Sequence, residues 1–581
     1  MSRIRHALAG ILVLSAIIAL PALAAIATTK HNLSVSGPGT LKATSESEIC
    51  IFCHAPHNAS PSGQLWNRNV GTTYTPYTSS TRKSTPGQPN GASLLCLSCH
   101  DGTIALGQVL NRTTPITMQG GAMTGNTLIG TNLSDDHPVS FVYDAALQSL
   151  RGELADPATL VKPAKVRLDG SGRLQCTSCH DPHDNTNAKF LVIANAASAL
   201  CQTCHVKNYW ANSDHKTSTK TWNGSGTNPW PHTTETTVAA NACENCHRPH
   251  TAGGSSRLLN YSAEESNCFP CHNGNVATKN LQAEFSKFST HAVANYTGAH
   301  DPAETDPVAT EHVECADCHN PHAVNASGGS FPGSLAGTRG IGISGASANP
   351  ATDEYQICFR CHADGAANVP SPSTARLIAQ NNKRLEFQTT NPSFHPVAGP
   401  GRSSTMPSLS GMTLNGVSLT STSVIKCTDC HNNNSGPGAG GTGPKGPHGS
   451  TYKPLLERNY TTTDPTSENA SAYALCYKCH NRNSILSQNV TGSFTFHWYH
   501  VDATSNVRAP CNTCHDPHGI SGTQGTELNN SRLMNFNSAI VTPSPGNGAA
   551  RWERVGTIGG KCYLTCHGIN HNGWSYSGGP P

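Results

Sequence analysis

The sequence predicts mostly irregular coil with short α-helices and few strands, around a core that amino-acid side chains do not supply. Only 36% of the 581 residues are hydrophobic and 6% are aromatic, although a chain of this length would ordinarily hold three or four domains. With 54 Gly and 38 Pro, the chain has too few apolar side chains for several protein-only cores. The 24 Cys and 30 His indicate what fills the core instead.

The N-terminus predicts a secretory signal peptide over residues 1–24. Arg3 and Arg5 precede the apolar stretch Ala7–Leu20, and Ala22–Ala24 offers a small-residue cleavage site. The apolar run is short for a spanning helix, and no second stretch could cross a bilayer. We therefore expect an exported protein, periplasmic or extracellular at the cell surface, with no membrane span after cleavage.

Every cysteine belongs to one of twelve motifs in which a histidine directly follows the second cysteine. Eleven motifs are C-x-x-C-H, and the last is one residue longer, C-x-x-x-C-H. In chain order they are Cys50/Cys53-His54, Cys96/Cys99-His100, Cys176/Cys179-His180, Cys201/Cys204-His205, Cys243/Cys246-His247, Cys268/Cys271-His272, Cys315/Cys318-His319, Cys358/Cys361-His362, Cys427/Cys430-His431, Cys476/Cys479-His480, Cys511/Cys514-His515 and Cys562/Cys566-His567.

This spacing is the attachment motif of c-type haem. Two thiols a short turn apart add to the two vinyl groups of one porphyrin, and the next residue places its imidazole under the iron. A disulfide framework gives no reason for a histidine after all twelve second cysteines, and zinc sites do not require one as the immediate neighbour. We expect twelve covalent haems c, which would supply the core of an elongated chain.

The motifs alternate in type, so the chain divides into six tandem modules of two haems. Odd-numbered motifs continue to a Pro-His dipeptide; in the ninth motif it follows an insertion, Asn432–Gly446. The Pro-His histidines are His57, His183, His250, His322, His448 and His518. The predicted modules span residues 25–150, 151–225, 226–290, 291–385, 386–495 and 496–581.

The repeat resembles the doubled-CxxCH multihaem cytochromes c of metal-reducing bacteria. The phrases Lys30–Ser34, Ile49–His57 and Asp136–Val139 are similar to recurring ones in that family. The resemblance covers nearly the whole mature chain and implies haem binding and electron transfer. The Asn432–Gly446 insertion and the longer twelfth motif depart from the family pattern.

The second axial ligand decides whether a haem carries electrons or binds a substrate. Methionine is scarce, whereas histidines outside the motifs outnumber the haems. We expect each Pro-His histidine to bind the neighbouring haem of its own pair, because the rigid proline aims it away from its own ring.

The other six distal ligands are expected ahead of the odd-numbered motifs. His31, His137 and His395 are the candidates in their segments. Elsewhere alternatives stay open, and the following choices are made: His215 over His232, His291 over His300 or His312, and His500 over His497. His571 is expected to be spare.

The formal charge of +3 is misleading, because two propionates per haem make the loaded protein anionic. Nucleic-acid binding is not indicated. The expected partners are other redox proteins such as cytochromes, metal ions or metal oxides, and further copies of the chain.

The sequence favours an electron carrier that conducts towards extracellular acceptors, with no catalytic residues. A second interpretation is a protein that stores electrons on its haems. The alternative is a multihaem reductase with one open-coordinate haem.

Overall fold

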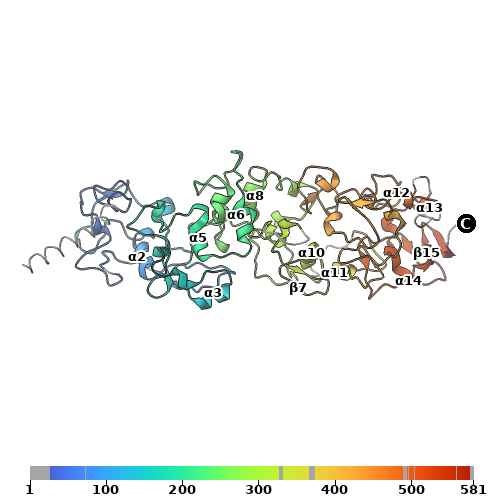
Figure 1. The fold of residues 1–581 in the computed structure, drawn as a ribbon, viewed down its shortest axis with the longest axis horizontal. Helices are drawn as coiled ribbons and strands as arrows, with labels where there is room; N and C mark the ends of the chain where they lie inside the picture. Colours follow the sequence, from blue (N-terminus) through green and yellow to red (C-terminus); the bar gives the residue numbers. More distant parts are fainter. Residues whose placement is uncertain are drawn as a thin grey trace, which may run out of the picture. The chain divides into compact units, whose positions relative to one another are not determined.

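The structure, a computed structural model, consists mainly of irregular coil with short helices and a few strands, as the sequence predicts (Figure 1). It describes residues 26–325, 332–365 and 373–575, except 64, 72, 489–493, 495, 503, 505 and 558. The predicted signal peptide lies outside the described residues. Within them, the longest helix has ten residues, and no helix is long and apolar enough to cross a membrane.

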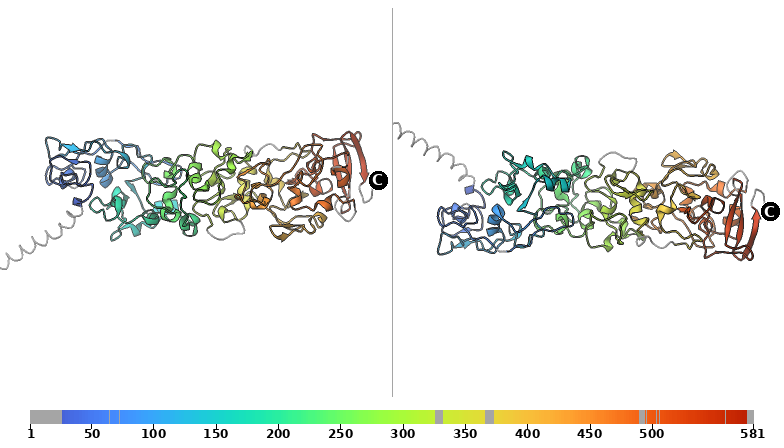
Figure 2. Two further views of the ribbon diagram at one scale, coloured as in Figure 1. Left: turned by 90° about the horizontal axis from the view of Figure 1, so that it is seen from above. Right: turned by 90° about the horizontal axis from the view of Figure 1, so that it is seen from below.

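The chain forms two compact units, described separately here. Unit 1 comprises Met1–Cys268 with Thr297–Ala303, and unit 2 comprises Phe269–Tyr296 with Glu304–Pro581. The six predicted modules are finer than this division and stay predictions. Figure 2 shows the same short elements and connecting coil from two further sides.

Unit 1 has short helices and two-residue strands. Its helices are α2 (Gly91–His100), α3 (Ala145–Arg151), α4 (Cys176–Cys179), α5 (Ala199–Cys204), α6 (Asp214–Thr217) and α7 (Val238–Asn241). Its strands are β1 (Lys42–Ala43), β2 (Met118–Gln119), β3 (Phe141–Val142) and β4 (Arg173–Leu174), paired β1 with β2 and β3 with β4. Helix α8 (Glu265–His272) crosses the division between the units.

Unit 2 repeats this pattern and adds one larger sheet. Its helices are α9 (Cys315–Cys318), α10 (Glu354–His362), α11 (Lys383–Glu386), α12 (Arg482–Ile485), α13 (His497–Val501) and α14 (Glu527–Asn530). Its short strands are β5 (Ser289–Thr290), β6 (Gly340–Ile341), β7 (Ser347–Ala348), β8 (Ser393–Phe394), β9 (Thr413–Leu414), β10 (Val417–Ser418), β11 (Gly449–Ser450) and β12 (Gly519–Ile520).

Eleven of the motifs begin or lie in a helical turn, as expected. The backbone N–H of the motif histidine donates to the carbonyl of the first cysteine, for example His180 to Cys176 at 2.9 Å and His431 to Cys427 at 2.8 Å. This bond closes one α-helical turn, which brings both thiols and the imidazole to one side of the backbone. The turns outside the α-helices are η1 (Cys50–Phe52), η7 (Ala242–Asn245), η14 (Cys427–Asp429), η16 (Cys476–Lys478) and η17 (Cys511–Thr513).

The twelfth motif lies in a sheet instead. Strand β15 (Gly559–Cys566) pairs along one edge with β13 (Val541–Thr542) and β14 (Arg551–Val555), and along the other with β16 (Ile569–Ser575). All four strands are antiparallel to their neighbours. The longer spacing between its cysteines therefore accompanies a different local fold.

The apolar core consists of several small clusters. One lies in unit 1 around Tyr143 and Leu160, and one in unit 2 around Phe359 and Phe387. A third, under the C-terminal sheet, contains Leu564 together with partly buried Cys514, Cys562 and Cys566. The thiols of three attachment cysteines thus border apolar surface.

Candidate haem-binding sites

Ten pairs of histidine rings face one another at nearly the same separation. Their ring centres lie 6.1–6.3 Å apart, with interplanar angles from 15° to 74°. In unit 1 the pairs are His31–His100, His54–His183, His137–His205 and His180–His250. In unit 2 they are His291–His362, His319–His448, His395–His480, His431–His518, His497–His515 and His500–His571.

The separation fits an iron held between two imidazoles. A histidine nitrogen lies about 2 Å from the metal it binds, and the ring centre about 1 Å further, so two rings on one metal have centres about 6 Å apart. Direct ring stacking would bring the centres closer, as for His31 and Phe190 at 4.2 Å. The constant spacing and variable angle match a shared axis through one metal.

Hydrogen bonds at Nδ1 orient many of these rings. In half of the twenty rings Nδ1 bonds a backbone carbonyl, for example His100 to Thr127 at 2.7 Å, His180 to Lys189 at 2.9 Å and His515 to Arg532 at 3.0 Å. A ligating histidine ordinarily donates its other N–H to such a carbonyl, which fixes the ring and directs Nε2 to the metal.

Three other histidines use Nε2 for hydrogen bonds or ion pairs within the protein. Nε2 of His232 contacts the Glu244 carbonyl at 3.0 Å, that of His312 lies 3.2 Å from a Glu304 carboxylate oxygen, and that of His567 lies 2.7 Å from Asp464 Oδ1. This arrangement favours the choice of His215 over His232 and of His291 over His312. It differs from the prediction for His567, the motif histidine of the twelfth site.

The pairing crosses from one module to the next. Four Pro-His histidines face a motif histidine of the preceding module: His183 faces His54, His250 faces His180, His448 faces His319 and His518 faces His431. The expectation was a partner within the same module. The structure instead directs each ring to the odd-numbered motif before its own, because the Pro-His turn docks on the earlier module.

The backbone of the same Pro-His turn also holds the distal histidine of the even-numbered motif. Nδ1 of His31 contacts the Pro182 carbonyl at 3.1 Å, Nδ1 of His291 contacts the Pro447 carbonyl at 2.9 Å, and Nδ1 of His395 contacts the Pro517 carbonyl. His137 donates its backbone N–H to the Pro249 carbonyl at 2.8 Å. One turn therefore positions ligands for both sites of the module before it.

Short strands fix this docking. Strand β8 pairs with β12, which puts Phe394 opposite Gly519, and β5 pairs with β11, which puts Thr290 opposite Gly449. In each case the residue after the first strand is the distal histidine, and the residue before the second is the Pro-His histidine.

The sixth predicted module has a different source of facing histidines. Helix α13 carries His497 and His500 one turn apart, and they face His515 and His571. The sequence favoured His500 over His497 as alternatives and left His571 spare; the structure gives all three a facing ring.

The fifth motif shows that the second cysteine can lie just outside its helical turn. Helices were expected at the attachment motifs, but η7 ends at Asn245, so half-buried Cys246 follows the turn and does not belong to it. The backbone N–H of Cys246 donates to the Cys243 carbonyl at 3.2 Å, and its own carbonyl accepts from Asn260 at 2.8 Å. The chain leaves the turn at Cys246 because the next residue, His247, forms a β-bridge with Leu259. The assignment of the Cys246 thiol as a haem attachment point stays a prediction.

The other motifs with a short 3₁₀ turn share this arrangement. In each, the second cysteine directly follows the turn and its N–H donates to the carbonyl of the first cysteine; these residues are Cys53, Cys430, Cys479 and Cys514. The helical part of these motifs is therefore shorter than in α2 or α10, which run through both cysteines to the histidine.

The chain matches one family model over part of its length. Residues 170–208, 236–277 and 423–484 match the doubled CXXCH motif. No curated protein matches the chain. The matches support a multihaem c-type cytochrome. They cover the third and fourth, the fifth and sixth, and the ninth and tenth motifs of the chain.

Burial lowers the pKa of several of the facing histidines. Desolvation is the largest cause, and it lowers the pKa to about 4 for His362, His431, His480, His515 and His571. Neutral imidazole is the form that binds metal, so these sites are prepared for ligation at neutral pH.

Motif cysteines of successive predicted modules lie in contact. Thiols hydrogen-bond between an even-numbered motif and the next odd-numbered one, in the pairs Cys96–Cys176, Cys201–Cys243, Cys358–Cys427 and Cys476–Cys511. The described cysteines form no disulfide bonds. Porphyrins attached at these thiols would approach each other at their edges.

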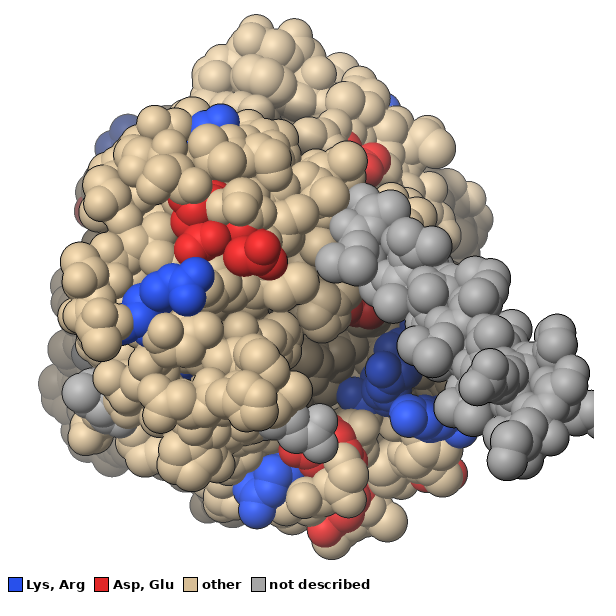
Figure 3. All heavy atoms as spheres, turned by 90° about the vertical axis from the view of Figure 1, so that its left-hand side faces the viewer, with Lys and Arg blue, Asp and Glu red and all other residues tan. Residues whose placement is uncertain are grey.

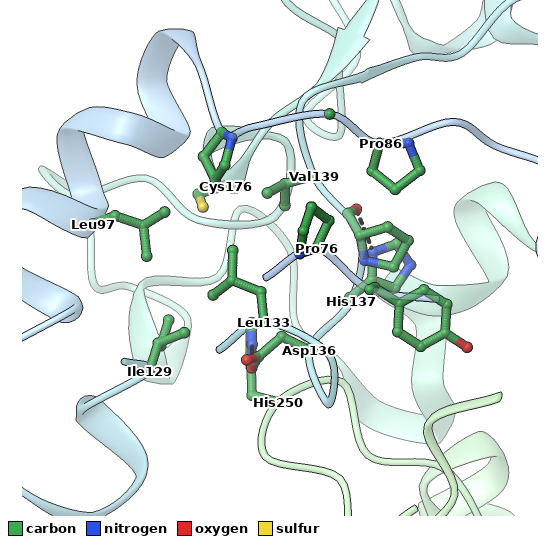
Figure 4. Close-up of a pocket in the computed structure, with 14 residues that line it drawn as sticks. Pro76, Pro86, Leu97, Ile129, Leu133, Asp136, His137, Val139, Cys176 and His250 are labelled. Carbon is green, nitrogen blue, oxygen red and sulfur yellow. Dashed lines mark hydrogen bonds and ion pairs between the residues drawn. The ribbon is translucent and has the colours of Figure 1, made fainter. Parts of the chain in front are cut away.

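A pocket in unit 1 shows the surroundings of one such attachment (Figure 4). Cys176 and His250 border it together with the apolar side chains Leu97, Leu133 and Val139. Apolar walls beside a thiol and an imidazole fit the face of a porphyrin. We infer that the residues present fit covalent haem, whose iron supplies one-electron chemistry when bound.

Three of the facing histidines lie beside carboxylates; Nδ1 of His183 is 3.7 Å from Asp181 Oδ1, and the other two are closer. Nδ1 of His250 lies 3.0 Å from Oδ1 of buried Asp136, and Nδ1 of His518 lies 3.3 Å from Oε2 of Glu386. A carboxylate partner makes the imidazole a stronger donor to the metal. This environment favours the oxidised iron at these two sites.

The remaining predicted ligands have less distinctive surroundings. His215 lies on α6, the backbone N–H of His322 donates to Asn320 Oδ1 at 3.0 Å, and His247 Nδ1 contacts the Arg257 carbonyl at 2.9 Å. His57, the Pro-His histidine of the first module, is exposed.

Proposed function

We propose that this protein is an exported electron carrier with twelve covalent haems c, each held between two histidines. The ten facing imidazole pairs support this proposal most directly, because their spacing and hydrogen bonds suit bis-histidine iron. His215 and His322 remain proposed ligands from their place in the repeat.

The contacts between attachment cysteines support conduction along the chain. Haems attached at these thiols would have the edge of an even-numbered haem beside that of the next odd-numbered one. The Pro-His turns add a second link, since His180 and His183 would bind two different haems three residues apart. An electron can thus pass between modules by short steps.

The proposed partners are other redox proteins and extracellular acceptors such as metal oxides. Figure 3 shows one face of the protein on which charged side chains are few and acidic and basic groups lie close together. On such a face, haem propionates would contribute much of the charge, which favours cationic partners.

The proposal is tested by the ligation state of the native protein. Intact mass should show twelve haems, and electron paramagnetic resonance should show only low-spin ferric iron. Carbon monoxide should bind negligibly to the reduced protein. A native high-spin haem that binds nitrite or carbon monoxide and turns over would instead identify the reductase alternative.

A further inference from the structure

We propose that His571, and not the motif histidine His567, is the axial ligand on the Cys562/Cys566 side of the twelfth haem, opposite His500. The inference rests on the proposed function, since it concerns one haem of the carrier. It assigns the ligand at the one motif that departs from C-x-x-C-H.

The backbone turns His567 away from the place that a motif histidine occupies elsewhere. Strands β15 and β16 are joined by His567 and Gly568, with φ of 48° and 78°. Two successive positive φ values are typical of a tight hairpin turn. In other motifs a helical hydrogen bond from the histidine N–H, such as that of His180 or His431, directs the imidazole to the haem side. At His567 strand pairing replaces this bond.

The imidazole of His567 also contacts a carboxylate of the protein. Its Nε2 lies 2.7 Å from Asp464 Oδ1, and the Asp464 side chain is 9% exposed. An Nε2 held by a buried carboxylate is not free for iron. In rings of the facing pairs such as His31, His100 and His431, the nitrogen that bonds the protein is Nδ1 instead.

The hairpin places His571, and not His567, beside the two motif cysteines. His571 pairs directly with Leu564, midway between Cys562 and Cys566 on β15. Directly paired residues of an antiparallel ladder point to the same face, and so do alternate residues of one strand. Leu564, Cys562 and Cys566 all border the same apolar cluster, so His571 lies on the face of both thiols.

The opposite ligand is in place as well. The ring centres of His571 and His500 are 6.3 Å apart, within the range of the other nine pairs. Nδ1 of His500 contacts the Phe496 carbonyl at 2.8 Å, which leaves its Nε2 to face His571. His571 is 9% exposed, as a ligand between a sheet and a porphyrin should be.

The experiment compares His571→Ala with the matched control His567→Ala in the haem-loaded full chain. Both proteins should retain twelve haems by intact mass. His571→Ala should gain one high-spin haem in twelve and bind one carbon monoxide per reduced molecule, and added imidazole should reverse both. His567→Ala should stay low-spin and bind none.

A second substitution covers the case in which His571→Ala does not fold. His571→Met supplies a sulfur ligand, so one haem should rise in potential, because His/Met ligation raises it relative to bis-histidine. His567→Met should leave all potentials unchanged.

Two results would overturn the inference. Carbon monoxide binding by His567→Ala, or a raised potential in His567→Met, would restore the motif histidine as ligand. A native mass of eleven haems with free Cys562 and Cys566 would remove the site, while the carrier function would stand on the other haems.

Discussion

The imidazole of His183 faces that of His54, with ring centres 6.2 Å apart and planes 20° from parallel, although His183 follows His180 by only three residues. His180 itself faces His250, from the next module. Neighbouring modules are therefore interleaved: in each unit, a later module supplies ligands to the one before it.

Replacing His183 should affect the first haem and not the third. In His183→Ala, the haem of Cys50 and Cys53 loses its second ligand, whereas His180 and His250 still hold the third. We expect one high-spin haem in twelve, measured by electron paramagnetic resonance and carbon monoxide titration. The matched control is His57→Ala, which removes the Pro-His histidine of the first module. It should leave all twelve haems low-spin.

Removing the carboxylate beside His250 should raise the potential of the third haem. Asp136→Asn keeps the shape but takes away the charge that strengthens the imidazole as a donor. A tenfold change in the one-electron equilibrium corresponds to about 60 mV, and we expect a shift of roughly this size in redox titration. Glu527→Gln removes an exposed carboxylate of unit 2, which pairs with Arg402, and should leave the titration unchanged; a shift there would contradict a local cause.

The buried guanidinium of Arg360 should be important for stability. It lies between Cys358 and Cys361 and contacts Asp306 at 2.8 Å and Glu304 at 3.1 Å. Arg360→Met would remove the closest cation from both carboxylates and should cost about 3–5 kcal/mol in the free energy of unfolding. The control Arg112→Met breaks an exposed pair with Glu46 and should change it by less than about 0.5 kcal/mol, measured by denaturant titration.

Acid should destabilise the folded protein before it protonates the buried histidines. Burial lowers the pKa of His431 and His480 from 6.5 to about 4. Between these two pH values the unfolded chain therefore binds protons that the folded chain does not bind. The free energy of unfolding should therefore fall as the pH drops from about 6.5 to about 4. Denaturant midpoints at pH 7 and pH 5 test this; an unchanged midpoint would contradict it.

The sequence predicted the character of the fold because composition and motif spacing are local properties. It also indicated that a histidine such as His183 reaches a haem other than its own, since a proline fixes the direction of the chain at that point. It could not indicate which haem. That depends on pairings between distant residues, such as Phe394 with Gly519, which no local pattern encodes.

The hairpin at the twelfth motif was not predicted, for a different reason. The extra residue lies in strand β15 of that hairpin, and motif spacing alone does not distinguish a helical turn from a strand. A signal was present: the turn dipeptide His567-Gly568 lies between segments with strand-favouring residues, including Tyr563 and Ile569. That pattern would have put His571 across from Leu564.

Helix α13 contributes the ring that faces the eleventh motif, whereas Pro-His turns contribute it at four earlier odd-numbered motifs. A chain that stopped just before α13 would therefore do more than omit the last two attachment motifs. It would also leave the fifth module without His518, which faces His431, and without the Pro517 carbonyl that holds His395. Cutting the chain between two modules thus removes ligands from the module before the cut.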